Sequence, residues 1–337
     1  MNNRLIIRVT KSSLLFAVAD PAEQNKVAFE PYIMKSGISL AANLREAFRT
    51  SDLLNRDYER AMLEVNTPTM LVPIQEFDEQ SLRELYNATF TGYESYALIH
   101  QVLPHLNAIV AFAVNKDLRL VVEDHFTDVR FQHVMQPVWS HMLNRSFTGT
   151  RRKLYAYFHD KYIDVFSFDK NRFRFSNRFE MTSVNDAVYH ILHVWKTIGM
   201  DAQSDELYLC FATMQQLNEA TAKPAADAPA QTMGIVDLLR RYASKTYTIN
   251  PSAEFNRAPV TLVKGIPFDL MVQLHKASGP ARRGRPPCLP APLQRLLRSV
   301  QRAYARSRRL CRVQLRLRRV QGSFSATLRN RTNGPLS

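Results

Sequence analysis

The chain has 337 residues, enough for two domains that each bury a core of their own. Its formal net charge of +15 would by itself suggest a nucleic-acid-binding protein. However, residues 277–337 contain fifteen Arg and no Asp, Glu or Lys. Removing that segment together with Lys276 takes sixteen positive charges from +15 and leaves −1 for residues 1–275. The body is therefore nearly neutral, and the nucleic-acid interpretation depends on the tail alone.

Cysteine content and hydropathy exclude two further classes of protein. Two of the three Cys, Cys288 and Cys311, lie in the basic tail, so the sequence has no disulfide framework and no CxxC metal pair. The longest apolar run, Ala108–Val114, has seven residues. A membrane-spanning helix needs ~20. Arg4 and Arg8 interrupt what would be the apolar core of a signal peptide. We therefore expect a cytoplasmic protein without membrane insertion.

The N-terminal part of the chain predicts three strands followed by a helix. Apolar residues recur with the two-residue period of a strand over Leu5–Val9, Leu14–Ala19 and Val27–Ile33. Thr10–Ser13 provides the first turn, and Ser39–Phe48 has the spacing of an amphipathic helix. Two short strands, a helix and a longer strand then follow, in this order, at Met62–Val65, Met70–Val72, Asp78–Phe90 and Tyr96–Leu103.

A strand–helix–strand unit completes the first half. Ala108–Val114 is apolar throughout, which is typical of a strand that is covered on both faces. Asn115 is a suitable N-cap for a helix over Asp117–Phe126, and a strand follows at Val129–Val134. Parallel neighbours require a helical crossover of this kind, so we expect these two strands to be parallel partners.

The second half of the chain repeats this plan. Three strand patterns joined by short turns occupy Lys153–Phe158, Tyr162–Phe168 and Phe173–Phe179. Ser183, with Asp186 three residues later, has the form of a capping box that opens a helix. A second strand–helix–strand unit occupies Leu207–Phe211, Ile235–Ala243 and Tyr247–Ile249. Because the same features recur in the same order, the sequence predicts a duplicated α/β fold, with two mixed sheets flanked by helices.

This duplication predicts two domains and a tail. We expect the first domain at residues 1–148 and the second at 149–276, with a mobile Pro/Ala-rich insertion at 221–232. Within the tail at 277–337, Arg283–Pro286 has the form of an AT-hook core, whose Arg side chains enter the minor groove of DNA. Alternatively, the tail is a GC-rich coding region read out of frame. Either interpretation predicts a disordered or irregular segment, and nucleic acid is a partner only if the tail is genuine.

The paired three-strand units resemble the duplicated RNase H-like domains of actin-like ATPases, and most of all the bacterial branch that contains FtsA and PilM. Asn250–Arg257 (NPSAEFNR) and Gly265–Leu270 (GIPFDL) are similar to the C-terminal signature of DUF3822, an uncharacterised family of the Bacteroidetes. The resemblance covers residues 4–275 and stops at the tail. It implies the actin-like fold and brings no established activity with it.

The same resemblance implies a nucleotide site between the domains, where each first hairpin turn supplies Asp and Gly. Here the first turn, Thr10–Ser13, has neither an acid nor a Gly, and in the second turn Asp160 has no Gly neighbour. The glycine pair that the resemblance implies after Leu207–Phe211, for binding adenosine, is replaced by Ala212-Thr213. We therefore expect no cofactor. The weak candidates that remain for contact with phosphate are Lys11, Ser12 and Asp160.

Polar residues just beyond the last predicted strand are the other binding candidates. Such residues line the crevice at the carboxyl ends of parallel strands in α/β sheets. The candidates are Glu254, Asn256 and Arg257. The structural alternative is that Asn250 and Ser252 cap a turn while Glu254 pairs locally with Arg257.

These observations favour a non-catalytic cytoplasmic protein with a degenerate actin-like fold that acts by binding an unknown protein partner. His190 and His193 are three residues apart on one predicted helix, but no Cys or acid completes a metal site, so we expect neither a metal nor a catalytic residue. Two alternatives stay open. One is a nucleotide-binding assembly ATPase of the FtsA/PilM type, with unconventional contacts around Lys11 and Asp160. The other is a nucleic-acid-associated factor that uses the basic tail.

Overall fold

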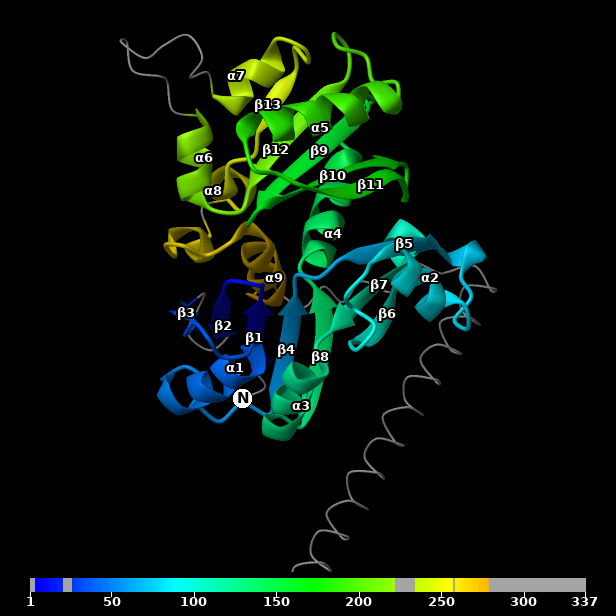
Figure 1. Ribbon diagram of the computed structural model, residues 1–337. Coiled ribbons are helices and arrows are strands. Elements are labelled where there is room, and N and C mark those ends of the chain that lie inside the picture. The colour runs from blue at the N-terminus through cyan, green and yellow to red at the C-terminus, as the bar shows by residue number, and fades with distance from the viewer. Residues whose placement is uncertain (1–3, 21–25, 222–233, 257, 279–337) are drawn as a thin grey trace, which may run out of the picture. The chain divides into compact units, whose positions relative to one another are not determined.

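The structure, a computed structural model, describes residues 4–20, 26–221, 234–256 and 258–278 (Figure 1). These ranges belong to one compact unit that spans Met1–Pro280. Two predicted segments lie outside the described residues: the insertion at 221–232, except for Thr221, and the tail at 277–337, except for Ala277 and Ser278. The domain boundary between residues 148 and 149 stays a prediction.

The first half of the chain forms a five-stranded mixed sheet in the order β3-β2-β1-β4-β8. The first three strands are antiparallel, and β4 and β8 continue the sheet parallel to β1. The strands are β1 (Arg4–Val9), β2 (Leu14–Asp20), β3 (Lys26–Tyr32), β4 (Arg60–Val65) and β8 (Asp128–His133). Helices α1 (Leu40–Thr50) and α3 (Lys116–His125) each begin at a residue whose side chain accepts a hydrogen bond from a backbone N–H of the first turn. These N-caps are Ser39 and Asn115.

The second half forms another five-stranded sheet, in the order β11-β10-β9-β12-β13. Its strands are β9 (Lys153–His159), β10 (Tyr162–Asp169), β11 (Arg172–Glu180), β12 (Glu206–Phe211) and β13 (Thr246–Thr248). Three antiparallel strands are again followed by two strands that are parallel to the first of them. The two sheets therefore have the same topology, and the predicted duplicated α/β fold is confirmed.

Helix α5 (Val184–Thr197) begins as its sequence predicts. The Ser183 hydroxyl accepts a hydrogen bond from the Asp186 N–H, and the Asp186 carboxylate accepts one from the Ser183 N–H. Beyond its C-cap, Gly199 has a φ of +63°, the left-handed conformation that favours glycine. The later helical elements are α6 (Met214–Thr221), α7 (Ile235–Arg240), α8 (Pro251–Glu254), η3 (Pro259–Leu262) and α9 (Phe268–Ser278). Among the helices of the described ranges, none combines the length and apolar character needed to cross a bilayer.

A third, three-stranded sheet is inserted between β4 and α3, in the order β5-β7-β6. It consists of β5 (Thr69–Pro73), β6 (Ala97–Leu103) and β7 (Ala108–Val114), with η1 (Ile74–Glu76), α2 (Leu82–Thr89) and η2 (Pro104–Leu106) between them. All of its pairings are antiparallel, and β8 pairs with β4. The predicted parallel pairing of Ala108–Val114 with Val129–Val134 is therefore wrong. Apolar side chains on both faces of β7 show that both faces are buried, and burial does not determine which strand lies alongside.

Helices α4 (Met135–Ser146) and α9 lie between the two five-stranded sheets in Figure 1 and pack against each other. The core that surrounds the first sheet continues through them to one face of the second sheet, where it includes Tyr155, Tyr157 and Phe166. The opposite face of the second sheet packs in a separate core with α5 and α7. The two halves thus share one apolar core through α4 and α9, which positions the first hairpin of each sheet.

Trp139 of α4 lies at the centre of this shared core and is 1% exposed. Its ring packs edge-on against Phe173 of β11, with centroids 5.4 Å apart. We predict that Trp139→Ala lowers the free energy of unfolding by about 3–5 kcal/mol, because it leaves a cavity between the halves. Phe147, 59% exposed at the C-cap of α4, provides the matched control, and Phe147→Ala is expected to cost less than about 1 kcal/mol. Urea unfolding followed by circular dichroism measures both, and equal losses would contradict the shared core.

Candidate functional site

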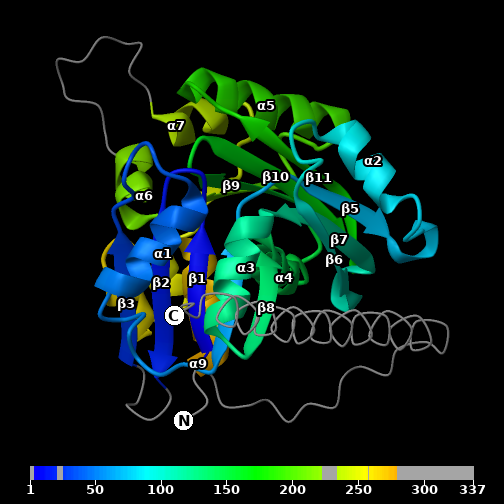
Figure 2. The same ribbon diagram turned by 60° about the horizontal axis from the view of Figure 1, so that its bottom comes forward.

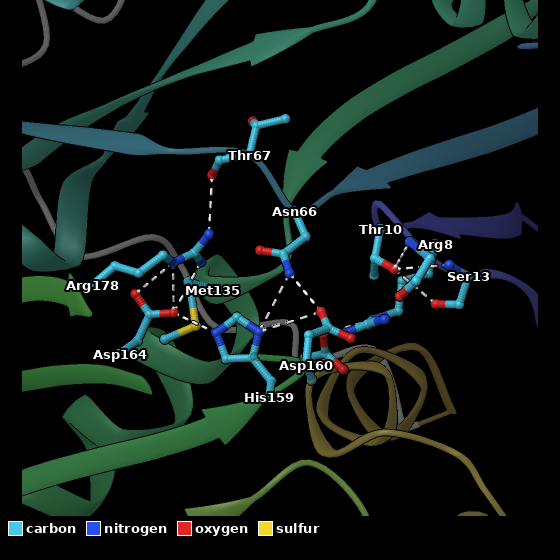
Figure 3. A network of polar contacts seen from close by, with 12 residues as sticks. Arg8, Thr10, Ser13, Asn66, Thr67, Met135, His159, Asp160, Asp164 and Arg178 are labelled. Atoms are coloured by element: carbon cyan, nitrogen blue, oxygen red, sulfur yellow. Dashed lines mark hydrogen bonds and ion pairs between the residues drawn. The ribbon is translucent and has the colours of Figure 1, made fainter. Parts of the chain in front are cut away.

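The first hairpin turns of the two sheets meet in a network of polar side chains (Figure 3). The turn between β1 and β2 contributes Thr10 and Ser13, and the end of β9 contributes His159 and Asp160. Asn66, which follows β4, lies between them. The fold therefore places both turns where the resemblance to actin-like ATPases implies a nucleotide.

The first turn is closed by its own side chains. The Thr10 hydroxyl accepts hydrogen bonds from the N–H groups of Ser12 (3.2 Å) and Ser13 (3.0 Å), and lies 2.9 Å from the Ser13 hydroxyl. The Thr10 N–H donates to the Ser13 carbonyl at 3.0 Å. Lys11 and Ser12 are exposed at the tip. The N–H groups of Thr10, Ser12 and Ser13, which could otherwise bind a phosphate, thus already have partners within the turn.

The second turn presents a carboxylate that is held by the first half of the chain. Asp160 has a φ of +49°, a left-handed conformation that Asp tolerates better than most residues. Its Oδ2 accepts a hydrogen bond from Asn66 Nδ2 at 2.7 Å. Burial raises the pKa of Asp160, but the hydrogen bond with His159 and the charge of Arg8 outweigh it, so the pKa lies below its ordinary value. Asp160 is therefore an anion at neutral pH that already has its partners.

Asn66 directly connects the two halves. Its N–H donates to the Val9 carbonyl at the end of β1 (3.0 Å), which fixes its backbone to the first sheet. Its side-chain amide reaches both Asp160 and, at 3.4 Å, His159 Nδ1. One residue thus contacts the first sheet through its backbone and the second through its side chain.

Behind this connection lies a buried group of charged side chains. His159 Nε2 is 2.5 Å from Asp164 Oδ2, and Arg178 of β11 donates to the same carboxylate at 2.9 Å. Burial raises the pKa of Asp164, but the charge of Arg178 and the hydrogen bond with His159 outweigh it and hold the pKa far below its ordinary value. Arg178 also donates to the Thr67 carbonyl at 3.4 Å, so this group too contacts the first half.

His133, at the end of β8, completes the network from the first sheet. Its Nε2 is 2.8 Å from the Thr67 carbonyl, and its Nδ1 accepts a hydrogen bond from the Met135 N–H at 3.2 Å. These contacts require a neutral ring that is protonated on Nε2. Burial, reinforced by the charge of Arg178, lowers the pKa of His133 well below its ordinary value, which agrees with that tautomer.

A second buried connection joins β1 to α9. Arg8 Nε donates to Asp269 Oδ2 at 2.8 Å, and both side chains are almost completely buried. Burial lowers the pKa of Arg8, but the charge of Asp269 outweighs it, so Arg8 stays charged. This pair was not predicted from the sequence. A charged residue inside the apolar run Leu5–Val9 was the available signal.

Glu64 of β4 lies beside this pair, because β4 is paired with β1 so that Glu64 is opposite Arg8. It is fully buried, and neither carboxylate oxygen has a hydrogen-bond partner among the described residues. Burial and then the negative charge of Asp269 raise the pKa of Glu64 to about 8, while Arg8 lowers it in part. Glu64 is therefore mostly protonated at neutral pH, which reduces the cost of burying it.

The residues at the two turns do not fit a triphosphate. Phosphate would have to displace the contacts within Thr10–Ser13 and the hydrogen bond between Asn66 and Asp160. At the position implied for adenosine, the Ala212 N–H donates to the Phe158 carbonyl (2.8 Å) and the Ala212 carbonyl accepts from the Phe268 N–H (2.7 Å). Of the three weak candidates, Asp160 belongs to the network, while Lys11 and Ser12 lie at the exposed tip of the first turn.

The crevice candidates lie at a different place in the fold. Glu254, the last residue of α8, accepts hydrogen bonds from His141 Nε2 (2.8 Å) and Arg145 Nη1 (2.5 Å) of α4. The hydrogen bond with His141 and the charge of Arg145 outweigh burial and lower the pKa of Glu254. Asn256 has a φ of +49°, and Arg257 lies outside the described residues. Glu254 thus attaches α8 to α4, and whether these residues form a binding crevice stays a prediction.

The predicted helix pair His190 and His193 contacts aromatic rings. His190 stacks on Phe179 of β11 with centroids 4.5 Å apart, and His193 stacks on Tyr189 at 5.8 Å. Over the described ranges of the chain, no group of three or more His, Cys, Asp or Glu side chains is arranged to hold a metal ion.

Comparisons with known proteins agree with this architecture. A family model described as "Protein of unknown function (DUF3822)" matches residues 1–219. A solved structure of a Bacteroides thetaiotaomicron VPI-5482 protein with an actin-like ATPase fold and unknown function has a TM-score of 0.64 at 20% identity, over 81% of this chain and 95% of that chain. The fold predicted from the resemblance is therefore confirmed.

Two further solved structures are less similar. A chain of a PilM–PilN type IV pilus biogenesis complex has a TM-score of 0.47 at 11% identity, over 82% of this chain and 99% of that chain. The ethanolamine utilization protein EutJ from Carboxydothermus hydrogenoformans has a TM-score of 0.40 at 9% identity, over 80% of this chain and 89% of that chain. Among curated proteins, no match to the sequence was found.

The environment of Glu64 predicts a pH dependence of stability. Because its pKa rises from 4.5 to about 8 on folding, the folded state binds this proton more tightly, and the stabilisation is lost as the pH rises through about 8. We predict that the free energy of unfolding falls between mildly acidic and mildly alkaline pH, by on the order of 5 kcal/mol from this group. Glu64→Gln is expected to remove this fall, whereas the exposed control Glu219→Gln should retain it. Urea unfolding across that pH range measures the effect, and an unchanged profile for Glu64→Gln would refute the assignment.

Proposed function

We propose that this chain, which belongs to the DUF3822 family and has the actin-like ATPase fold, acts by binding a protein partner and does not use a nucleotide. The fold alone does not supply this function, since one fold hosts many activities. The proposal rests on the chemistry at the two turns.

The observation that carries the proposal is the contact between Asn66 and Asp160. In a nucleotide-binding protein of this fold, the triphosphate would connect the two hairpin turns. Here the 2.7 Å hydrogen bond between these side chains connects the two halves directly. Inserting a triphosphate between the turns would break this bond, so the two halves would lose a direct connection.

The other connections between the halves support a fixed arrangement. Arg8 with Asp269, Arg178 with the Thr67 carbonyl, and Glu254 with α4 each join segments that are more than 100 residues apart in sequence. Breaking a buried ion pair by removing one partner typically costs about 3–5 kcal/mol. A body held in this way supports recognition by a rigid surface better than a cycle of opening and closing.

The inserted three-stranded sheet supports protein binding. It adds a strand edge at β6 and the exposed side chain of Leu85 on α2. Exposed strand edges and apolar side chains are features that partner proteins use. We also propose a cytoplasmic location, because Cys210, in β12, is a free thiol buried in the core.

The proposal predicts that the full chain does not bind Mg·ATP with micromolar affinity. The measurement is isothermal titration calorimetry of the full chain with Mg·ATP, repeated with Mg·ADP. The expected result is heat no greater than dilution, because the N–H groups of Ser12 and Ser13 and the carboxylate of Asp160 already have partners. Saturable micromolar binding that Asp160→Ala abolishes would instead support a nucleotide-dependent protein.

A further inference from the structure

We propose that a groove between β5 and β11 binds an extended acidic segment of a partner protein, which adds a strand to β11. This inference rests on the proposed protein-binding function and names the surface and the chemistry of the partner. It follows from the position, the edges and the charges of the groove.

The groove lies between two sheets. A cavity of about 340 Å³ is lined on one side by residues of β5 and η1 and on the other by the β11 segment 172–176. Figures 1 and 2 both show β5 and β11 side by side, and η2, which also lines the cavity, packs near β11. Each of these strands is at the edge of its sheet, so among the described residues no strand pairs with the side of β11 that faces away from β10.

Several other edges of the described sheets are protected against pairing. Edge strands β3 and β5 contain Pro31 and Pro73, which have no N–H to donate, and β13 has only three residues. In contrast, β11 has nine residues and contains no proline. An incoming strand would therefore find its backbone donors and acceptors on β11 rather than on the β5 wall of the groove.

The charges on the β11 wall select an acidic partner. Arg172 and Arg174 are exposed and line the cavity, and on the opposite wall Glu76 is the charged residue that lines it. Arg174 falls at a β-bulge and donates to the Ile198 carbonyl at 2.5 Å. Bulges often redirect a side chain, and here the guanidinium is held at Ile198, the C-cap of α5. Two positive charges against one negative charge favour carboxylates next to β11.

The aromatic residues of the same segment indicate what accompanies these carboxylates. Phe173 and Phe175 are half-buried and line the cavity, and the bulge at Arg174 places them on opposite faces of the sheet, Phe173 against the shared core and Phe175 against the core with α5 and α7. In strand addition, main-chain hydrogen bonds provide affinity and side-chain contacts on the two faces of the strand provide specificity. The partner segment is therefore extended and contains both Asp or Glu and apolar residues.

The test begins with a phage-displayed library of random decapeptides selected on the full-length chain. The expected result is enrichment of peptides that combine acidic with apolar residues. Synthetic copies with a fluorescent label are then measured by anisotropy against the wild type, the double variant Arg172→Glu/Arg174→Glu and the control Arg45→Glu, which changes an exposed charge on α1. We expect the double variant to weaken binding at least about tenfold, and the control to leave it unchanged.

Hydrogen exchange distinguishes the addition of a strand to β11 from purely electrostatic binding to the arginines. Peptide binding is expected to slow amide exchange within Arg172–Ser176 and to leave β3 unaffected. Binding should also weaken as salt rises, because the arginines are exposed.

The inference is overturned if no peptide is enriched, if enriched peptides lack acidic residues, or if they bind the double variant equally well. Binding of a single-stranded RNA oligomer that the double variant abolishes, with no peptide enriched, would assign the arginines to nucleic acid instead. Peptides that bind elsewhere on the chain would refute the assignment of the groove as the binding site, but would be consistent with the proposed protein-binding function. Mg·ATP binding by calorimetry would overturn the proposed function without affecting the groove.

Discussion

The ion pair between Arg8 and Asp269 determines where helix α9 packs against the N-terminal strand β1. The two residues are 261 positions apart, and their side chains are almost completely buried. A buried charge costs several kcal/mol unless it has a partner, so α9 has to lie where Asp269 meets Arg8. This places α9 between the sheets and against α4. The short distance between Asn66 and Asp160 depends on that placement.

The local structure near the candidate site was predictable from sequence, because local patterns determine it. The hairpin turns at Thr10–Ser13 and Asp160 follow from alternating apolar residues interrupted by polar ones. The capping box of Ser183 and Asp186 depends on residues three apart. The internal repeat then predicted the duplicated fold. In each case the chemistry that fixes the element lies within a few residues.

The connections across the halves were not predictable in the same way. Asn66 and Asp269 each depend on a partner far away in sequence, and no local pattern identifies it. The orientation of β7 was predicted incorrectly for a related reason: the run Ala108–Val114 shows burial on both faces, while the inserted module determines its antiparallel partners. For Glu64, a carboxylate within the apolar strand β4 was the signal available in the sequence.

The left-handed backbone at Asp160 shows that the shape of the second turn and its ligand chemistry are separable. The turn has the φ value that glycine adopts most easily, so its path is one that a phosphate-binding loop could follow. The hydrogen bond to Asn66 is made by the carboxylate of Asp160 and not by the main chain of the turn. Main-chain geometry alone is therefore a poor guide to nucleotide use among proteins of this architecture. Nucleotide use is better judged from the side chain at the position of Asp160. That side chain can be absent, free, or already bonded to the opposite half of the protein.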